Sequence, residues 1–279
     1  MHCKLSILYL ILSSICVSLF AQMTPNAPVK NFRLPRFSEN GYTQWVLQGG
    51  KGIYDDATQV RVEEMALRVY SGDERMAQEL SLDSPQATLR IQENRAFSDE
   101  SILIIGENFE ISGIGWTWDG TSKVIEVMGA VEVNFEQGLN AALSGQSSVQ
   151  SQKTVIRSEH LKLKTTELEY DFTFTGRVTV DSGTMQLSSD ALNAVAEAPK
   201  GKSESGAKLG MGALSAIRQI HAERNVVIRD SGRTVRAALA EFTPSEQRVI
   251  LSGGAQIELE SAYLSGDRIE SESGVLTLV

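Results

Sequence analysis

The residue types that most often carry chemistry in proteins are sparse in this sequence and do not group. The chain has three histidines, and only His160 and His221 lie beyond the N-terminal segment. Each directly precedes a predicted strand, and neither has a Cys or Glu at the spacing of a zinc site or of a histidine base. The sequence therefore predicts no bound metal, no cofactor and no histidine-based catalysis.

Acidic, glycine-rich and aromatic positions give no stronger sign of an active site. The pairs Asp55–Asp56 and Glu63–Glu64 are adjacent in sequence, and adjacent side chains of a strand point to opposite faces, which does not suit hydrolysis by two carboxylates. Glycines within 113–120 precede no helical pattern and form no nucleotide loop. The three tryptophans are Trp45, Trp116 and Trp118. They could stack on sugars, but in a β-protein we expect them in the core or at its rim. Because none of these positions suggests an active site, we expect that the protein is not an enzyme.

The N-terminus has the parts of a Sec-type signal peptide. A basic start with Lys4 precedes an uncharged apolar run over 5–20, and small Ala21 follows that run. We predict a signal peptide over 1–21 with cleavage after Ala21. Retention as a membrane anchor is the alternative, because Leu19 is not the small residue preferred three positions before the cut.

Composition excludes several classes of site and partner. The formal net charge is −9, and removing the +1 of Lys4 with the signal peptide gives −10. Nucleic-acid binding needs a basic stripe, which is missing, and the acidity suits a soluble surface. Both cysteines, Cys3 and Cys16, lie in the predicted signal peptide, so the mature chain would have neither a disulfide nor a thiol ligand.

The elements that must position any site are short β-strands. Apolar and polar residues alternate with period two between Gly, Asn and Asp turns, and no stretch sustains a strong helical period. One face of the run over 125–135 is predicted to hold Ile125, Val127, Val131, Val133 and Phe135. The alternation returns over 168–174, 178–180 and 255–260. This pattern predicts a β-sandwich, a jelly roll or a solenoid.

An internal repeat of strand, glycine and strand occurs around Gly129, Gly176 and Gly254. Such a glycine marks a turn, a bulge or a sheet corner where a side chain would obstruct. A second repeat contains Asp-Ser-Gly at 181–183 and 230–232, which predicts hairpin turns. Repeats of this kind stack so that each covers its neighbour's apolar face.

Three segments interrupt the pattern. Residues 196–212 are polar and Gly-rich and are predicted to form a flexible surface loop. Residues 137–152, rich in Gly, Ser and Ala, are predicted to connect two β units. Residues 73–82 suit either a short helix or an acidic loop.

Further motifs fill both halves of the chain. The N-terminal half contains FRLPRF at 32–37, NGYTQWVL at 40–47, GIY at 52–54 and GENFEISGIGW at 106–116. The C-terminal half contains HAERNVVI at 221–228, VRA at 235–237, EF at 241–242, VILSG at 249–253 and LSGD at 264–267. In this order they resemble the lipopolysaccharide-transport periplasmic proteins of the LptA and LptC type, the OstA-like family. The first half is similar to LptC and the second half to LptA.

The resemblance implies an all-β fold, a twisted open β-jelly roll whose two stacked repeat units form an elongated V-shaped slot. The implied units are an LptC-like β unit over 22–136 and an LptA-like β-jelly-roll unit over 153–279, joined by 137–152. One unit of each kind leaves open whether the chain has the role of LptA, of LptC or of both.

The function implied by the resemblance is the binding of lipopolysaccharide through the acyl chains of its lipid A. Such proteins pass lipopolysaccharide across the periplasm, between an inner-membrane ABC transporter and an outer-membrane translocon. The slot-lining candidates are Ile125, Val127, Val131, Val133, Phe135, Val178, Val180, Val226, Ile228, Val249, Leu251 and Ile257. For any one of them, ordinary core packing is the alternative.

The two chain ends suggest self-association. Residues 274–279 are β-prone and have no charged side chain, and the opposite end has Pro35 within 32–37. An unprotected edge can add a strand, which predicts head-to-tail association, unless the last strand is protected inside its own sheet. The alternative functions are a structural β-solenoid or adhesin-like protein without a lipid ligand, and a carbohydrate-active protein with carboxylates converging in a cleft.

Overall fold

A computed structural model gives the structure of the chain over 28–56, 58–106, 109–135, 153–166, 168–197, 215–246, 248–272 and 275–278. The predicted signal peptide and the predicted connecting segment 137–152 lie outside these residues. Most of the predicted loop 196–212 does as well, but Ala196 and Glu197 belong to a strand.

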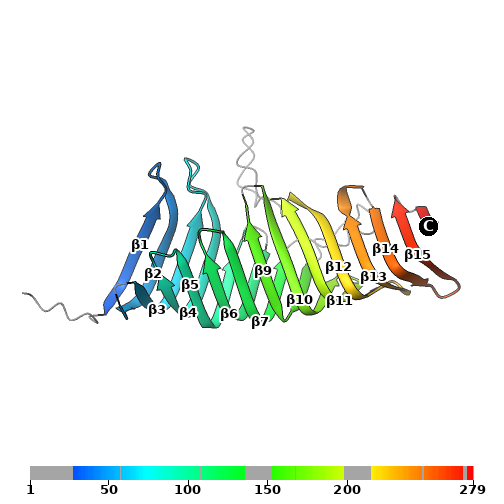
Figure 1. Cartoon of the computed structure of the whole chain (residues 1–279), viewed down its shortest axis with the longest axis horizontal. Coiled ribbons are helices and arrows are strands. Elements are labelled where there is room, and N and C mark those ends of the chain that lie inside the picture. The colour runs from blue at the N-terminus through cyan, green and yellow to red at the C-terminus, as the bar shows by residue number, and fades with distance from the viewer. Residues whose placement is uncertain are drawn as a thin grey trace, which may run out of the picture.

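The described residues form one sixteen-stranded antiparallel sheet, drawn out into an elongated row of strands from the N-terminal to the C-terminal end (Figure 1). The strands are β1 (Val29–Phe37), β2 (Thr43–Tyr54), β3 (Gln59–Tyr70), β4 (Gln78–Arg90), β5 (Arg95–Ile105), β6 (Phe109–Asp119), β7 (Val124–Phe135), β8 (Thr154–Ser158), β9 (His160–Thr165), β10 (Glu169–Ser182), β11 (Met185–Glu197), β12 (Ser215–Asp230), β13 (Arg233–Thr243), β14 (Arg248–Glu258), β15 (Tyr263–Glu272) and β16 (Val275–Leu278), with a short 3₁₀ turn η1 (Pro244–Glu246). The all-β, jelly-roll-like fold class is confirmed.

Period-two alternation is the local reason for the strands. In β7 the five predicted inward residues are buried, and Glu126, Met128, Glu132 and Asn134 between them are partly or fully exposed. The helix considered for 73–82 does not form, because 78–82 already pair as the start of β4 with β3. The first Asp-Ser-Gly turn falls one residue later than predicted, at 183–184, since Ser182 is still paired with Met185.

Each long strand bends once, and the bends form a line of corners across the sheet. The ladder registers shift at this line in one strand pair after another. Backbone with positive φ occurs there at Glu64, Ala130, Gly176, Asn225 and Gly254. The repeated glycine therefore marks a corner inside a continuous strand, one of the three predicted possibilities.

Three strands of the opposite direction, β4, β8 and β11, have a serine at the corner. The Oγ atoms of Ser84, Ser158 and Ser189 each donate to the carbonyl oxygen two residues ahead, at 3.0, 2.9 and 2.9 Å respectively. A short side chain that bonds its own backbone stabilises such a bend, because it satisfies a carbonyl that the ladder leaves open.

The line of corners divides the sheet into two arms. We call arm A the part that ends in the turns at 38–42 and 183–184, and arm B the part that ends in the turns at 91–94 and 120–123. The apolar side chains of both arms pack against each other in one core cluster. The space expected as a slot is therefore filled in this structure by side chains from the two arms.

The two halves of the chain share this sheet without a break. β7 pairs with β8 through Val131–Phe135 and with β9 through Val124–Val127, so that β8 and β9 together act as one bent strand. The proposed division into two units stays a prediction, and the sheet is continuous where the two units would meet.

Candidate functional site

The apolar interior between arms A and B is the candidate site. Eleven of the twelve predicted slot-lining residues are buried there with exposures of 8% or less, and Val249 is partly buried against the same cluster. Five of the twelve lie on β7 and seven on β10, β12 and β14. The structure thus brings the predicted residues to one interior, while their contact with a lipid stays a prediction.

Apart from Val249 and Leu251, sequence reasoning missed the part of this interior that arm B of the C-terminal half provides. The missed lining is rich in small residues, and its buried members include Leu192, Ala194, Ala196, Ile220, Ala222, Ala240 and Phe242. The signal was present as alternation over 192–196 and 220–222. Alanine has little preference for strands, so this alternation is weaker than that of valine and isoleucine.

A cluster of five aromatic rings spans the junction of the two halves. Phe172 is in its centre, with ring centroids 5.2 Å from Phe109, 5.3 Å from Phe135, 6.4 Å from Tyr170 and 6.3 Å from Phe174. Most contacts are tilted or edge-to-face, the geometry that aromatic pairs prefer. Because Phe109 and Phe135 belong to arm A and Phe172 belongs to arm B, the cluster holds the arms together.

A second aromatic contact closes the interior near the N-terminal end. Trp45 of arm A meets Trp118 of arm B edge to face, with centroids 6.4 Å apart. The indole N–H of Trp45 also donates to Asn94 Oδ1 at 3.1 Å. In the same half, the indole N–H of Trp116 donates to Ser84 Oγ at 3.3 Å. All three tryptophans are buried, as the sequence predicted.

The C-terminal half of the interior contains a small cavity. A cavity of about 10 Å³, close to the room one water molecule needs, lies between the arms. It is lined only by apolar surface, including Val180, Met185, Leu187, Ala194 and Phe242. This cavity is too small to hold an acyl chain, and the arms would have to separate here to admit one.

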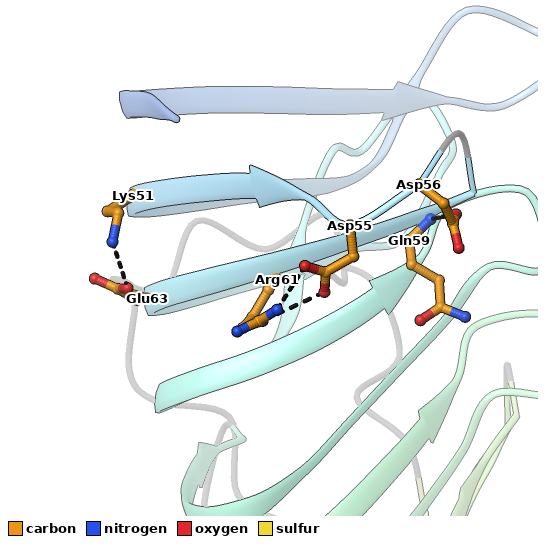
Figure 2. A network of polar contacts seen from close by, with 6 residues as sticks. All are labelled: Lys51, Asp55, Asp56, Gln59, Arg61 and Glu63. Atoms are coloured by element: carbon orange, nitrogen blue, oxygen red, sulfur yellow. Dashed lines mark hydrogen bonds and ion pairs between the residues drawn. The ribbon is translucent and has the colours of Figure 1, made fainter. Parts of the chain in front are cut away.

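On the outer face of the sheet, charged side chains pair with each other. Figure 2 shows Asp55 directed at Arg61 and Lys51 directed at Glu63. The distance from Lys51 Nζ to Glu63 Oε1 is 2.8 Å. Asp56 has a different role: its Oδ1 accepts from the hydroxyl and backbone N–H of Thr58, and these bonds hold its pKa below the usual value. Asp55 and Asp56 therefore do not act as a pair. Exposed ion pairs of this kind add little stability.

The histidines lie on the outer face. His221 Nε2 is 3.0 Å from Glu223 Oε1, and its Nδ1 is 3.5 Å from Glu241 Oε1. Within the residues that the structure describes, no three acidic, histidine or cysteine side chains are grouped for a metal ion. No helix in the same residues has the length and apolar character needed to cross a membrane.

A shallow depression of about 230 Å³ lies outside β10, β11 and β12. Asp181 is the carboxylate in its lining, which also includes Thr179, Ser188, Val227 and Arg229. Asp181 pairs with Arg157, the Nη1–Oδ2 distance being 3.0 Å. A single engaged carboxylate does not provide the converging pair that sugar hydrolysis would require.

Comparison with known proteins found a match for the C-terminal half of the chain. Residues 155–273, from β8 to the end of β15, match the family model of the LptA/(LptD N-terminal domain) LPS transport protein. No curated protein matches the sequence of the chain. This C-terminal segment is thus similar to a lipopolysaccharide-transport family, and the match does not separate an LptA role from an LptC role.

Proposed function

We propose, from the match of residues 155–273 to an LPS transport family, that this chain is a periplasmic lipopolysaccharide-binding protein. In this proposal it binds the acyl chains of lipid A between arms A and B and passes lipopolysaccharide toward the outer membrane. It catalyses no reaction and uses no cofactor. The observation that carries the proposal is the apolar interior of the matched segment, in which Val178, Val180 and Val226 face the opposite arm.

The energetics suit an acyl ligand. Burial of one methylene contributes ~0.8 kcal/mol, so an acyl chain with about ten buried methylenes would gain roughly 8 kcal/mol. That gain must exceed the cost of separating the arms, and in the C-terminal half arm B contributes small buried residues such as Ala194 and Ala222. The anionic sugars and phosphates would stay in water, where salt screens repulsion by the acidic protein.

The proposed partners are an inner-membrane lipopolysaccharide ABC transporter and an outer-membrane translocon, with the chain as a bridge between them. The signal peptide predicted over 1–21 would direct the chain to the periplasm, or would anchor it there if retained. The two edge strands of the described sheet, β1 and β16, are the proposed contact points.

Charge at the edges supports head-to-tail association of two copies. β1 contains Lys30, Arg33 and Arg36 and no acidic residue. β15, next to the edge strand β16, contains Asp267, Arg268, Glu270 and Glu272. An exposed edge can add a strand, and opposite charges favour one orientation.

The test is photo-crosslinking in lipopolysaccharide-producing cells, with the probe at Val226 and, in a separate variant, at Val227. The two are the same residue type and neighbours in β12, but Val226 is buried in the interior whereas Val227 lines the outer depression. Capture of lipopolysaccharide at Val226 and not at Val227 is the expected result. Capture at Val227 alone would place the ligand on the outer face and contradict the proposal.

The alternative function is a structural β-protein without a lipid ligand, and the filled interior with its cavity of about 10 Å³ favours it. No capture at Val226 or at other inward positions, in protein shown to be folded and exported, would support this alternative.

A further inference from the structure

The interior is built differently on the two sides of the aromatic cluster of Phe109, Phe135, Tyr170, Phe172 and Phe174. On the N-terminal side it contains large, fully buried side chains such as Leu82, Ile104 and Trp116. There the arms are also tied by the Trp45–Trp118 ring contact and by the hydrogen bond from Trp45 to Asn94. An acyl chain entering this side would have to displace both.

On the C-terminal side the arms meet through smaller side chains. Arm B presents Ala194, Ala196, Ala222 and Ala240 to the interior, each buried. The small apolar cavity lies on this side, next to Ala194. Separating the arms here breaks less apolar contact than separating them at Trp45 and Trp118, because an alanine buries far less surface than a tryptophan.

The C-terminal side also becomes progressively less covered. Arm A of one strand packs on arm B of a strand three or four places further along the sheet, as for Phe109 of β6 on Phe172 of β10. In the described chain, arm A of β14 and β15 has no such strand beyond it. Leu264 of β15 is accordingly only partly buried against the core cluster.

Resting on the function proposed above, we propose that the aromatic cluster is the inner end of the acyl-binding site. Acyl chains enter between the arms on the C-terminal side, lie against the alanines of arm B and end at Phe172. The N-terminal half stays a sealed core that serves as a rigid platform. The inward residues of β7 other than Phe135 then support the cluster from behind, and the lipid contacts the candidates on β10, β12 and β14.

The first test places a diazirine-bearing aliphatic residue at Leu187 or at Leu82, in separate preparations of the purified protein mixed with hexa-acylated lipopolysaccharide. Both leucines are buried in arm A, on the C-terminal and N-terminal sides of the cluster respectively. Capture at Leu187 and not at Leu82 is expected. Equal capture at both would contradict the proposal that the acyl-binding site ends at Phe172, but it would agree with lipid binding by this protein. Capture at neither position would contradict both the proposed function and the proposed end of the site.

A second test fills the proposed site instead of labelling it. Ala240→Leu on the C-terminal side is expected to weaken binding of hexa-acylated lipopolysaccharide about tenfold, the loss expected when about two methylene contacts are displaced. The control is Ala96→Leu, an equally buried alanine of arm B on the N-terminal side. It should leave the affinity unchanged in protein whose thermal unfolding shows it to be folded. Equal weakening by both substitutions would contradict the proposal.

Discussion

Trp45 in arm A of β2 and Trp118 in arm B of β6 meet edge to face, with ring centroids 6.4 Å apart. Their contact shows how the bent sheet closes on itself, because the outer part of arm A in β2 packs against the outer part of arm B in β6. Phe109 of β6 and Phe172 of β10 repeat this relationship at 5.2 Å. Side-chain contacts between the arms thus close the interior. The free energy needed to open it is therefore set by the packing contacts that separation of the arms would break.

The indole N–H of Trp45 should contribute to this closure beyond its ring. Trp45→Phe removes the hydrogen bond to Asn94 Oδ1. Trp118→Phe causes the same reduction in ring size but leaves that hydrogen bond intact. We expect the free energy of unfolding to fall by about 1 kcal/mol more for Trp45→Phe than for Trp118→Phe. Urea denaturation of both variants measures the difference, and equal losses would mean that the hydrogen bond adds nothing.

The corner at Gly176 should not tolerate a side chain. Its φ is +81°, and a Cβ atom there would lie 2.8 Å from Glu159 Cβ. Gly176→Ala should therefore destabilise by about 1–3 kcal/mol, through backbone strain and displacement of Glu159 from Arg177. At Gly129 the nearest atom to an added Cβ is Ile114 O at 3.6 Å, an ordinary contact. Gly129→Ala should be within about 0.5 kcal/mol of the parent protein in thermal unfolding, and similar losses in both variants would refute this account of the corner.

The turn between β6 and β7 should lose stability in acid through Asp119. Its Oδ1 accepts the backbone N–H groups of Thr121 and Ser122 at 2.9 and 3.0 Å, and the bond from Ser122 is the main cause that holds the pKa of Asp119 below 3.8. Since the folded pKa is depressed, this stabilisation is complete above the unfolded pKa and is lost as the pH falls through the folded pKa.

Asp119→Asn keeps an acceptor oxygen but cannot titrate. Between about pH 5 and about pH 2 the Tm of the parent protein should fall further than that of the variant. Parallel decreases in Tm would show that Asp119 does not contribute to the acid sensitivity.

Local pattern was enough to predict the strands and much of the interior. The alternation of Val131, Val133 and Phe135 with polar neighbours places them correctly on the buried face of β7, and the repeated glycine correctly marks a corner. Both features depend on neighbouring residues only, and a period of two leaves little choice of face.

The closure of the two arms could not be predicted in this way. Trp45 and Trp118 are far apart in sequence, and no periodicity indicates that the rims on which they lie would meet. The alanines of arm B were missed because Ala222 and Ala240 carry little strand signal of their own, and their burial is set by the opposite arm. Residues 78–82 join β4 because they pair with residues of β3. This pairing cannot be predicted from the acidic segment that directly precedes them.

The most direct test of lipid-acyl binding compares two ligands on the purified protein: hexa-acylated lipopolysaccharide and the same molecule after removal of its acyl chains. Titration calorimetry should detect binding of the acylated form and none of the deacylated form, because the proposed affinity resides in apolar contacts of residues such as Val180 and Val226. Equal affinity for the two forms would place recognition in the sugars and contradict an acyl-binding interior between the arms.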